Sequence, residues 1–363
     1  MSIDNNKVVA LLRTVIDPKT GLDLIRSKKL SQLKIADGRV SFELETSGMS
    51  DEDKRKLNFA CQEALLKEYP DINIDIHMTG AQGTTSNATS VIPQVKNVIA
   101  VASGKGGVGK STIAVNLALA LKKLGANVGV LDADLYGPSI PTMLHLKGER
   151  PKLQEVYGQP KIVPLMAYDI PVISMGFIVE PDQAVVLRGP RLAGVLKQFI
   201  QDVIWPELDY LVIDLPPGTG DVQLTLVQSV PVTGAVMVTT PQQVAVDDAI
   251  KAMNMFRLPN IQVPILGVVE NMSWFTPAEL PDNKYYIFGQ GGGTSLAKEA
   301  STVLLGQVPL IQGVREGGDE GKPIVLRDDH PGAAYFVKIA EETARQVAYR
   351  NEHLEPTTIV RVQ

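Results

Sequence analysis

Cysteine is nearly absent from this sequence, because Cys61 is the only one among its 363 residues. A single cysteine excludes an intrachain disulfide framework and any all-cysteine metal site made within one chain. We expect Cys61 to be a small buried hydrophobe on the apolar side of a helix. The four histidines lack metal-ligand spacing, which favours ordinary surface or core roles for His77, His145, His330 and His353.

Long apolar runs and excess positive charge are also lacking. No window approaches the roughly 18 apolar residues of a membrane span, and the opening residues MSIDNNKVVALL carry no basic region ahead of a long apolar stretch. The formal net charge of −5 gives no bulk attraction to nucleic acid or to an anionic membrane. We therefore expect a cytoplasmic protein that binds neither nucleic acid nor membrane.

What is present is typical of a soluble globular protein, with 44% hydrophobic and 21% charged residues. The length suits about two domains of roughly 150 residues each. Patterning predicts a small α+β domain over 1–80, a polar linker over 81–96, a second domain over 97–350 and a tail over 351–363. In the first domain we expect helices over 7–16 and 52–69, two strands within 31–45 and a strand over 72–78.

The second domain alternates short apolar runs with helical stretches, the pattern of parallel strands buried on both faces. The predicted fold is α/β, with a doubly wound, mostly parallel sheet and ligands at the carboxyl ends of its strands. The expected strands cover 98–103, 127–134, 210–217, 235–240, 265–271 and 306–310, and the clearest helices cover 110–125 and 244–257.

The strongest motif is GKGGVGKST, which follows the strand 98–103 and opens a helix. It is the pattern of a phosphate-binding loop, or P-loop, in the expected strand-to-helix context. The nucleotide-binding residues would be Gly104, Lys105, Gly106, Gly107, Val108, Gly109, Lys110, Ser111 and Thr112. Lys110 would reach the β- and γ-phosphates of ATP, and Ser111 would bind Mg²⁺. The alternative, a glycine-rich turn without a ligand, is disfavoured by the complete motif in this context.

Three carboxylates follow predicted strands. Asp214 ends the apolar run YLVID, where it would hold Mg²⁺, and the turn LPPGTGD after it could sense the γ-phosphate. Asp132 and Asp134 lie in VLDADLYGPS, where an acid could orient the attacking water or the metal. Either of these two could instead cap a turn or helix. Lys105, inside the loop, could be an ordinary solvated lysine.

The combined motifs resemble the Mrp family of MinD-type P-loop ATPases, whose members are described as iron–sulfur cluster carriers or scaffolds. The resemblance runs in order through GKGGVGKST, LDADLYGPSIP, LRGPR, VIDLPPGTGD, TTPQQVAVDDA, VVENMSWF, YYIFGQGGG and REGGDEGKP. The segment DPKTGLDLI resembles a domain found in iron–sulfur assembly proteins, although Lys19 replaces the usual glutamate.

The resemblance implies a homodimeric ATPase whose partners are iron–sulfur apoproteins or assembly proteins. It implies that Lys105 crosses the dimer interface to the partner's nucleotide. It assigns Asp134 and Asp214 to the two switch regions and places Asn271 against adenine, although Asn271 could also be a turn residue. Lys105, Lys110, Asp134 and Asp214 are thus the expected catalytic residues.

The long predicted loop from Asn271 to Gly293 departs from the family. Typical members carry a Cys-x-x-Cys pair there, which meets the partner subunit's pair around a 4Fe–4S cluster. Here the interval WFTPAELPDNKY has no cysteine, and Glu279 and Asp282 are expected to be solvated loop charges. Cluster ligands are therefore not evident in this chain.

Three functions follow from these patterns. The first is an ATPase that carries iron–sulfur clusters, or a cluster-free, ATP-switched assembly adaptor. The second is a MinD-like positioning ATPase. The C-terminal segment argues against it, because its apolar stripe is suited to packing in the core and not to binding a membrane. The third is an ATP-dependent ligase, for which the sequence has no further catalytic constellation.

Overall fold

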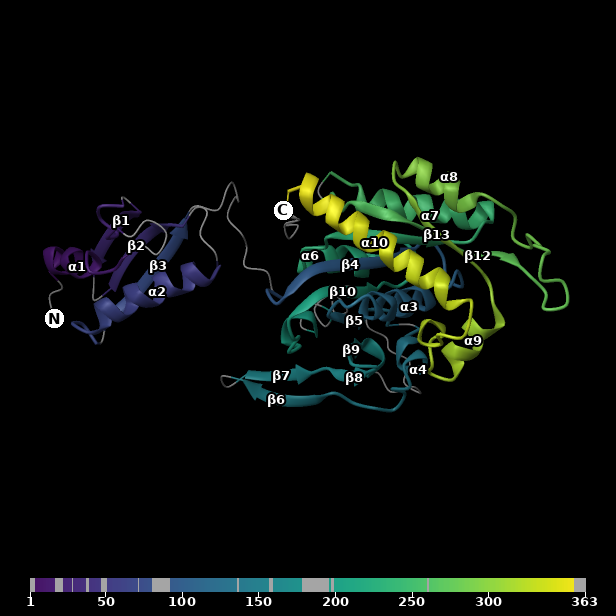
Figure 1. Cartoon of the computed structure of the whole chain (residues 1–363), viewed down its shortest axis with the longest axis horizontal. Helices are drawn as coiled ribbons and strands as arrows, with labels where there is room; N and C mark the ends of the chain where they lie inside the picture. Colours follow the sequence, from purple (N-terminus) through teal and green to yellow (C-terminus); the bar gives the residue numbers. More distant parts are fainter. Residues whose placement is uncertain are drawn as a thin grey trace. The chain divides into compact units, whose positions relative to one another are not determined.

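The structure is a computed structural model that describes most of the chain (Figure 1). The described residues are 4–16, 22–27, 29–36, 39–46, 51–70, 72–79, 92–135, 137–156, 159–177, 196, 199–259 and 261–355. Four predictions fall wholly or largely outside them: Lys19, the LRGPR motif at 187–191, most of the linker over 81–96 and the end of the tail over 356–363.

The chain divides into two compact units, Met1–Asn87 and Ala88–Gln363. The first contains α1 (Asn5–Leu12), β1 (Leu30–Ala36), β2 (Arg39–Glu45), α2 (Asp51–Leu66) and β3 (Asn73–Thr79). Its sheet has the order β1-β2-β3, with β1 and β2 antiparallel and β2 and β3 parallel. The small α+β fold expected from the sequence is therefore present.

The core of the first unit combines the apolar faces of both helices with β2. Cys61 is fully buried between Leu57 and Leu65 on α2, as its helical position predicted. The first helix is shorter than predicted, since α1 ends at Leu12 rather than Ile16. The Thr14 hydroxyl bonds the Leu11 carbonyl at 2.7 Å, and Ile16 pairs with Asp23 in an isolated bridge, so the chain has left the helix there.

The second unit is built on an eight-stranded sheet of order β13-β12-β11-β4-β10-β5-β9-β8. Every neighbouring pair is parallel except β8 and β9, which confirms the mostly parallel prediction. The strands are β4 (Val95–Ser103), β5 (Val128–Asp132), β8 (Leu165–Ala167), β9 (Ile170–Ser174), β10 (Leu208–Asp214), β11 (Gly234–Thr239), β12 (Ile265–Phe275) and β13 (Leu304–Leu310). Strand β4 begins at Val95, two residues before the predicted start of the domain.

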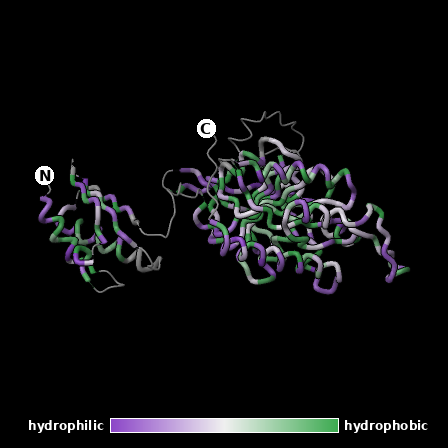
Figure 2. The backbone as a smooth tube through the Cα atoms, turned by 90° about the horizontal axis from the view of Figure 1, so that it is seen from above, coloured by the Kyte–Doolittle hydropathy of each residue, from purple (hydrophilic) through white to green (hydrophobic). Residues whose placement is uncertain are grey.

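Helices cover both faces of this sheet (Figure 1). They are α3 (Lys110–Lys123), α4 (Ile140–Met143), α6 (Asp221–Ser229), α7 (Gln243–Phe256), α8 (Gly292–Glu299), α9 (Gln312–Asp319) and α10 (Ala333–His353), with 3-10 turns η1 (Met175–Phe177) and η2 (Ile324–Leu326). Along β4, Ile99 and Val101 face α3 and α10, while Val98 and Ala100 face α6, α7 and α8. The two resulting apolar layers form the hydrophobic interior seen in Figure 2. None of the helices in the described residues is long and apolar enough to cross a membrane.

Three parts of the second unit differ from the sequence prediction. The strands β8 and β9 at one edge of the large sheet were not predicted. A separate antiparallel hairpin, β6 (Lys152–Val156) with β7 (Gln159–Val163), precedes β8 and was not predicted. Its alternating residues are mostly exposed or half-buried, so it lacks the apolar run that marked the other strands.

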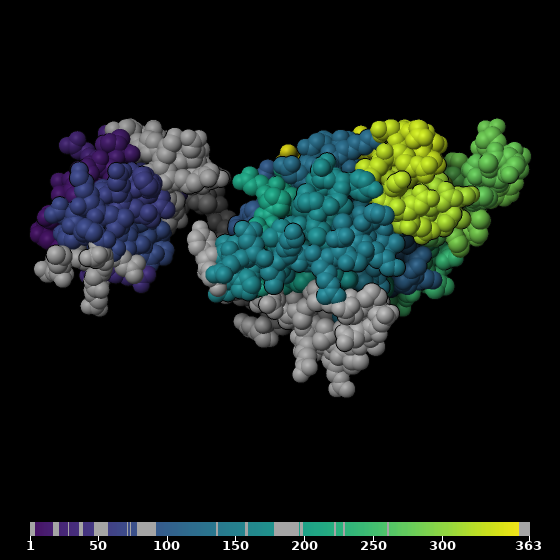
Figure 3. All heavy atoms as spheres, turned by 90° about the horizontal axis from the view of Figure 1, so that it is seen from below, coloured from purple at the N-terminus to yellow at the C-terminus, as the bar shows by residue number. Residues whose placement is uncertain are grey.

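The predicted loop from Asn271 to Gly293 is shorter than expected, because β12 continues to Phe275 and α8 begins at Gly292. An isolated antiparallel bridge between Phe275 and Tyr285 closes its base. The remaining segment, Thr276–Gly291, projects from the second unit in Figures 1 and 3. We call it the β12–α8 arm. Glu279 and Asp282 are exposed on it, as predicted.

Candidate functional site

The P-loop connects β4 to α3 at the carboxyl edge of the sheet. Gly107 and Gly109 both have φ near +83°, a backbone conformation that glycine adopts without strain. Gly104 is packed so closely that an added Cβ would lie 2.0 Å from the carbonyl carbon of Asp248 on α7. The glycines of the motif therefore serve both the curl of the loop and its close packing.

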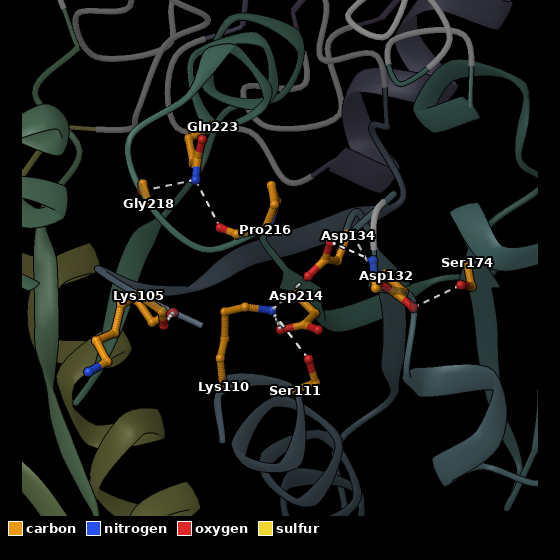
Figure 4. Close-up of polar contacts among 12 residues, drawn as sticks. Lys105, Lys110, Ser111, Asp132, Asp134, Ser174, Asp214, Pro216, Gly218 and Gln223 are labelled. Carbon is orange, nitrogen blue, oxygen red and sulfur yellow. Dashed lines mark hydrogen bonds and ion pairs between the residues drawn. The ribbon is translucent and has the colours of Figure 1, made fainter. Parts of the chain in front are cut away.

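Lys110 joins the P-loop to the acidic residues at the ends of two neighbouring strands (Figure 4). Its buried ammonium lies 2.7 Å from Asp214 Oδ1, at the end of β10, and 3.9 Å from Asp134 Oδ2, just after β5. It also lies 3.2 Å from the Ser111 hydroxyl. The structure thus brings Lys110, Ser111, Asp134 and Asp214 together from three segments, of which those of Lys110 and Asp214 are 104 residues apart.

Burial dominates the electrostatics of this cluster. Asp214 is fully buried, which raises the pKa of its carboxyl, while the Lys110 charge beside it works in the opposite direction. For Asp132, burial and the charge of Asp214 raise the pKa to about 8, against a smaller lowering by the hydrogen bond from Ser174. A positive charge added near these buried carboxyl groups would therefore stabilise their ionised form.

Asp132 does not line the cavity of about 250 Å³ that lies beside the P-loop. Its Oδ1 accepts a hydrogen bond from the Asp134 backbone N–H at 3.1 Å, and its Oδ2 accepts one from the Ser174 hydroxyl at 2.8 Å. The Ser174 oxygen in turn accepts from the Gly176 N–H at 2.9 Å. Asp132 is therefore a cap for the turn that presents Asp134, which was one of the two roles open from the sequence. Ser174 had no sequence signal, since it lies in an unpredicted strand.

Lys105 lies at the rim of the same cavity, and its side chain points away from Lys110 and Asp214 (Figure 4). The Lys105 carbonyl accepts a hydrogen bond from the Ser103 hydroxyl at 3.1 Å, which fixes the start of the loop. Its ammonium group is therefore directed away from the cluster of its own subunit.

Two cavities meet at the P-loop. One, of about 250 Å³, is lined by the loop, Asp134 and Pro217. The other, of about 540 Å³, extends along α9 and includes Asn271 and Met272. Both are lined by Gly109, Thr112, Ser139 and Met143. Asn271 is buried and donates from Nδ2 to the Val108 carbonyl at 2.9 Å, so this hydrogen bond also holds the backbone of the P-loop in place.

The residues present fit a magnesium ion. Asp214 Oδ2 is buried and has no hydrogen-bond partner among the described residues, which leaves an acceptor oxygen in the cluster that also contains the Ser111 hydroxyl. Carboxylate and hydroxyl oxygens are the hard donors that Mg²⁺ prefers beside a nucleotide phosphate. When bound with ATP, Mg²⁺ would neutralise charge on the transferring phosphoryl group.

Comparison with known proteins agrees with this geometry. A family model described as NUBPL iron-transfer P-loop NTPase matches residues 94–344, and one described as iron-sulfur cluster assembly protein matches residues 5–76. The chain belongs to the NUBPL iron-transfer P-loop NTPase family.

One curated protein and two solved structures are similar to this chain. An iron-sulfur cluster carrier protein of Synechocystis sp. is 44% identical over 350 residues, which are 95% of this chain and 98% of that protein. A nucleotide-binding protein from Archaeoglobus fulgidus, solved with ADP, is 34% identical with a TM-score of 0.57 over 68% of this chain and 93% of that one. The Pyrococcus furiosus cell division ATPase MinD shares the fold, with 24% identity and a TM-score of 0.51 over 69% of this chain and 99% of that one.

The residues of this iron-transfer NTPase do not fit an iron–sulfur cluster held by the chain alone. The β12–α8 arm contains no cysteine, and the second unit as a whole has none. Cys61 is fully buried in the first unit, and burial raises the pKa of its thiol to about 12, far from the thiolate that binds iron. Within the part of the chain that the structure describes, no group of three or more His, Cys, Asp or Glu side chains could hold a metal ion.

Proposed function

We propose that this chain is a Mg²⁺-dependent ATPase that takes part in the binding and transfer of iron–sulfur clusters to apoproteins. The observation that carries the ATPase assignment is the contact of Lys110 with Asp214 and Asp134 beneath the P-loop. Cluster transfer is supported by the two family matches and by the 44% identical Synechocystis carrier protein. Because this chain lacks accessible thiolates, its partner would supply the cluster ligands.

The two adjoining cavities suggest how ATP binds. The phosphates would occupy the smaller cavity, where backbone N–H groups of the P-loop and the start of α3 favour anions. The adenosine would occupy the larger one, between Asn271 and α9. Lys110 would leave Asp214 for the β- and γ-phosphates, which frees both oxygens of Asp214 for Mg²⁺ and its water.

Hydrolysis would rest on positioning and on charge stabilisation. Asp134, held by its carboxylate contact with the Gly137 N–H at 3.2 Å and by Asp132 beneath it, would orient the attacking water. Lys105, directed away from its own subunit's cluster, would supply positive charge to the nucleotide of a second copy. The active form would therefore be an ATP-bound homodimer.

A cluster-free adaptor switched by ATP is the second candidate, and the missing cysteine pair favours it. One experiment separates the two. A 4Fe–4S apoenzyme is activated anaerobically with iron, sulfide and thiol, with and without this chain and Mg-ATP. We expect the wild type with ATP to accelerate activation and Lys110→Ala to have no effect.

The same preparation of the protein should hydrolyse ATP with Mg²⁺ alone, without a small carboxylate or amine as co-substrate. Equal activation with Lys110→Ala, alongside normal wild-type hydrolysis, would contradict both candidates, because each of them depends on ATP. Iron and sulfide that stay with this chain when it is separated from the apoenzyme by size would favour the carrier, and activation without bound iron or sulfide would favour the adaptor. Hydrolysis that requires a small co-substrate would favour a ligase instead.

A further inference from the structure

The turn that follows Asp214 is held by one buried side chain, Gln223 of α6 (Figure 4). Its Nε2 donates to the Pro216 carbonyl at 2.8 Å and to the Gly218 carbonyl at 3.0 Å. Both partners are acceptors, so the amide must present its NH₂ group to the turn. Gln223 is 1% exposed and therefore has no role at the surface.

This turn joins the magnesium carboxylate to the phosphate cavity. Pro217, between the two bonded carbonyls, lines that cavity. Gly218 has φ near +93°, and its N–H donates to the Ser103 carbonyl at 2.9 Å, where β4 leads into the P-loop. A shift of Pro216 or Gly218 would therefore move Pro217 within the cavity and change the path from Asp214 to the phosphates.

The other end of the Gln223 amide has no such bond. Its Oε1 is buried and has no hydrogen-bond partner among the described residues, and it lies 3.7 Å from where a Cβ on Gly220 would stand. Gly220 is the N-cap of α6, and Gln223 is the third helical residue after it. In a capping box, a glutamine at this position accepts a hydrogen bond from the N-cap backbone N–H. The oxygen thus lies near the N-cap of α6 without the hydrogen bond that a capping box would give it.

We propose that Gln223 is a positioning residue for ATP hydrolysis, which fixes the turn over residues 216–218 against the γ-phosphate through the two hydrogen bonds that its NH₂ group donates. This inference rests on the proposed ATPase function. Gln223 touches neither the nucleotide pocket nor Asp214 directly, so its effect passes through the turn. Its loss should slow turnover without weakening the grip of the P-loop on nucleotide.

Two variants of the full chain test this role. Gln223→Glu keeps the shape but replaces the NH₂ donor with an acceptor, which opposes the two carbonyls. Gln223→Met keeps the length of the side chain and removes both donor and acceptor. It adds no charge, so it still tests the role of Gln223 if the Gln223→Glu protein does not fold. Gln262→Glu, at an exposed position, adds the same charge away from the turn and serves as the control.

The measurements are kcat for ATP, Kd for ADP and the melting temperature. We expect both Gln223 variants to lose at least about tenfold in kcat, with the Kd for ADP within about twofold of wild type, and Gln262→Glu to be unchanged. Retention of wild-type kcat in either folded Gln223 variant would overturn the proposal. So would a parallel loss of ADP affinity and melting temperature, which would make Gln223 a packing residue. Absence of hydrolysis in the wild type would instead contradict the proposed function itself.

Discussion

Two lysines of one loop have different environments in this protein. Lys110 is buried against Asp214 and Asp134, whereas Lys105 stands at the cavity rim and points away from them. The same residue type is therefore suited to two tasks. Lys110 would serve the nucleotide of its own subunit, and Lys105 that of a second copy.

Replacing these lysines separately should separate the two tasks. Lys110→Ala should reduce kcat/KM for ATP at least about a hundredfold and abolish tight nucleotide binding, because it removes the charge beneath the phosphates. Lys105→Ala should leave ADP affinity near that of wild type and lower kcat by roughly a thousandfold, as expected for a charge supplied in trans. Lys147→Ala, at an exposed position, is the control.

Sedimentation of these variants with ATP adds a second readout. Wild type and Lys147→Ala should form dimers, and Lys105→Ala should remain monomeric. An equal loss of ADP affinity in Lys105→Ala and Lys110→Ala would argue that both lysines act within one subunit.

Among the elements, β12 connects the nucleotide pocket to the β12–α8 arm. Within this strand, Asn271 donates to the Val108 carbonyl of the P-loop, and the preceding Glu270 contacts α8 and β13 instead. The buried Glu270 carboxylate accepts from the Gly293 N–H at 2.6 Å and from Gln307 Nε2 at 2.7 Å. Met272 follows Glu270 and Asn271 in β12. Its φ is near +55°, which is strained for a residue that carries a side chain. The start of α8 is therefore fastened to the same strand that supports the P-loop.

Removal of the Glu270 carboxylate should detach the start of α8. Glu270→Ala leaves the buried Gly293 N–H without an acceptor, at a cost of about 1–3 kcal/mol, and also removes the acceptor of the half-buried Gln307 amide. We expect a fall in melting temperature of at least about 4 °C and faster proteolysis within the β12–α8 arm. Glu279→Ala, on the exposed part of the arm, should change neither quantity. Unchanged stability in Glu270→Ala would mean that the carboxylate does not anchor the helix.

Sequence patterns predicted most strands of the large sheet and the P-loop. The strand β9 was missed although it is buried along its whole length, because its short run IPVIS contains a proline, which cannot donate a hydrogen bond within a sheet. The strands β4, β10 and β11 were visible because both faces are buried, and the P-loop because glycines and lysine recur at fixed spacing. The hairpin β6–β7 was missed because its residues are mostly exposed and lack that run. Ser174 and Gln223 were missed for another reason: their roles depend on contacts with Asp132, Pro216 and Gly218, which only the folded chain creates.

For the whole molecule, the main finding is a disagreement between the family and one segment of this chain. Lys110, Ser111, Asp134 and Asp214 lie together at the P-loop, but the chain's sole thiol, Cys61, is buried in the first unit. Two subunits would together contribute two cysteines, fewer than the four thiolates of a typical 4Fe–4S cluster. We therefore expect a partner protein to supply the remaining cluster ligands.

Anaerobic reconstitution of the purified chain with iron and sulfide, followed by desalting, tests this claim most directly. Iron and sulfide are counted and the visible absorption recorded for wild type and for Cys61→Ser, with and without Mg-ATP. We expect that neither protein retains a stoichiometric cluster by itself and that the two behave alike. Retention of about one stable cluster per dimer on the wild type alone would contradict this expectation.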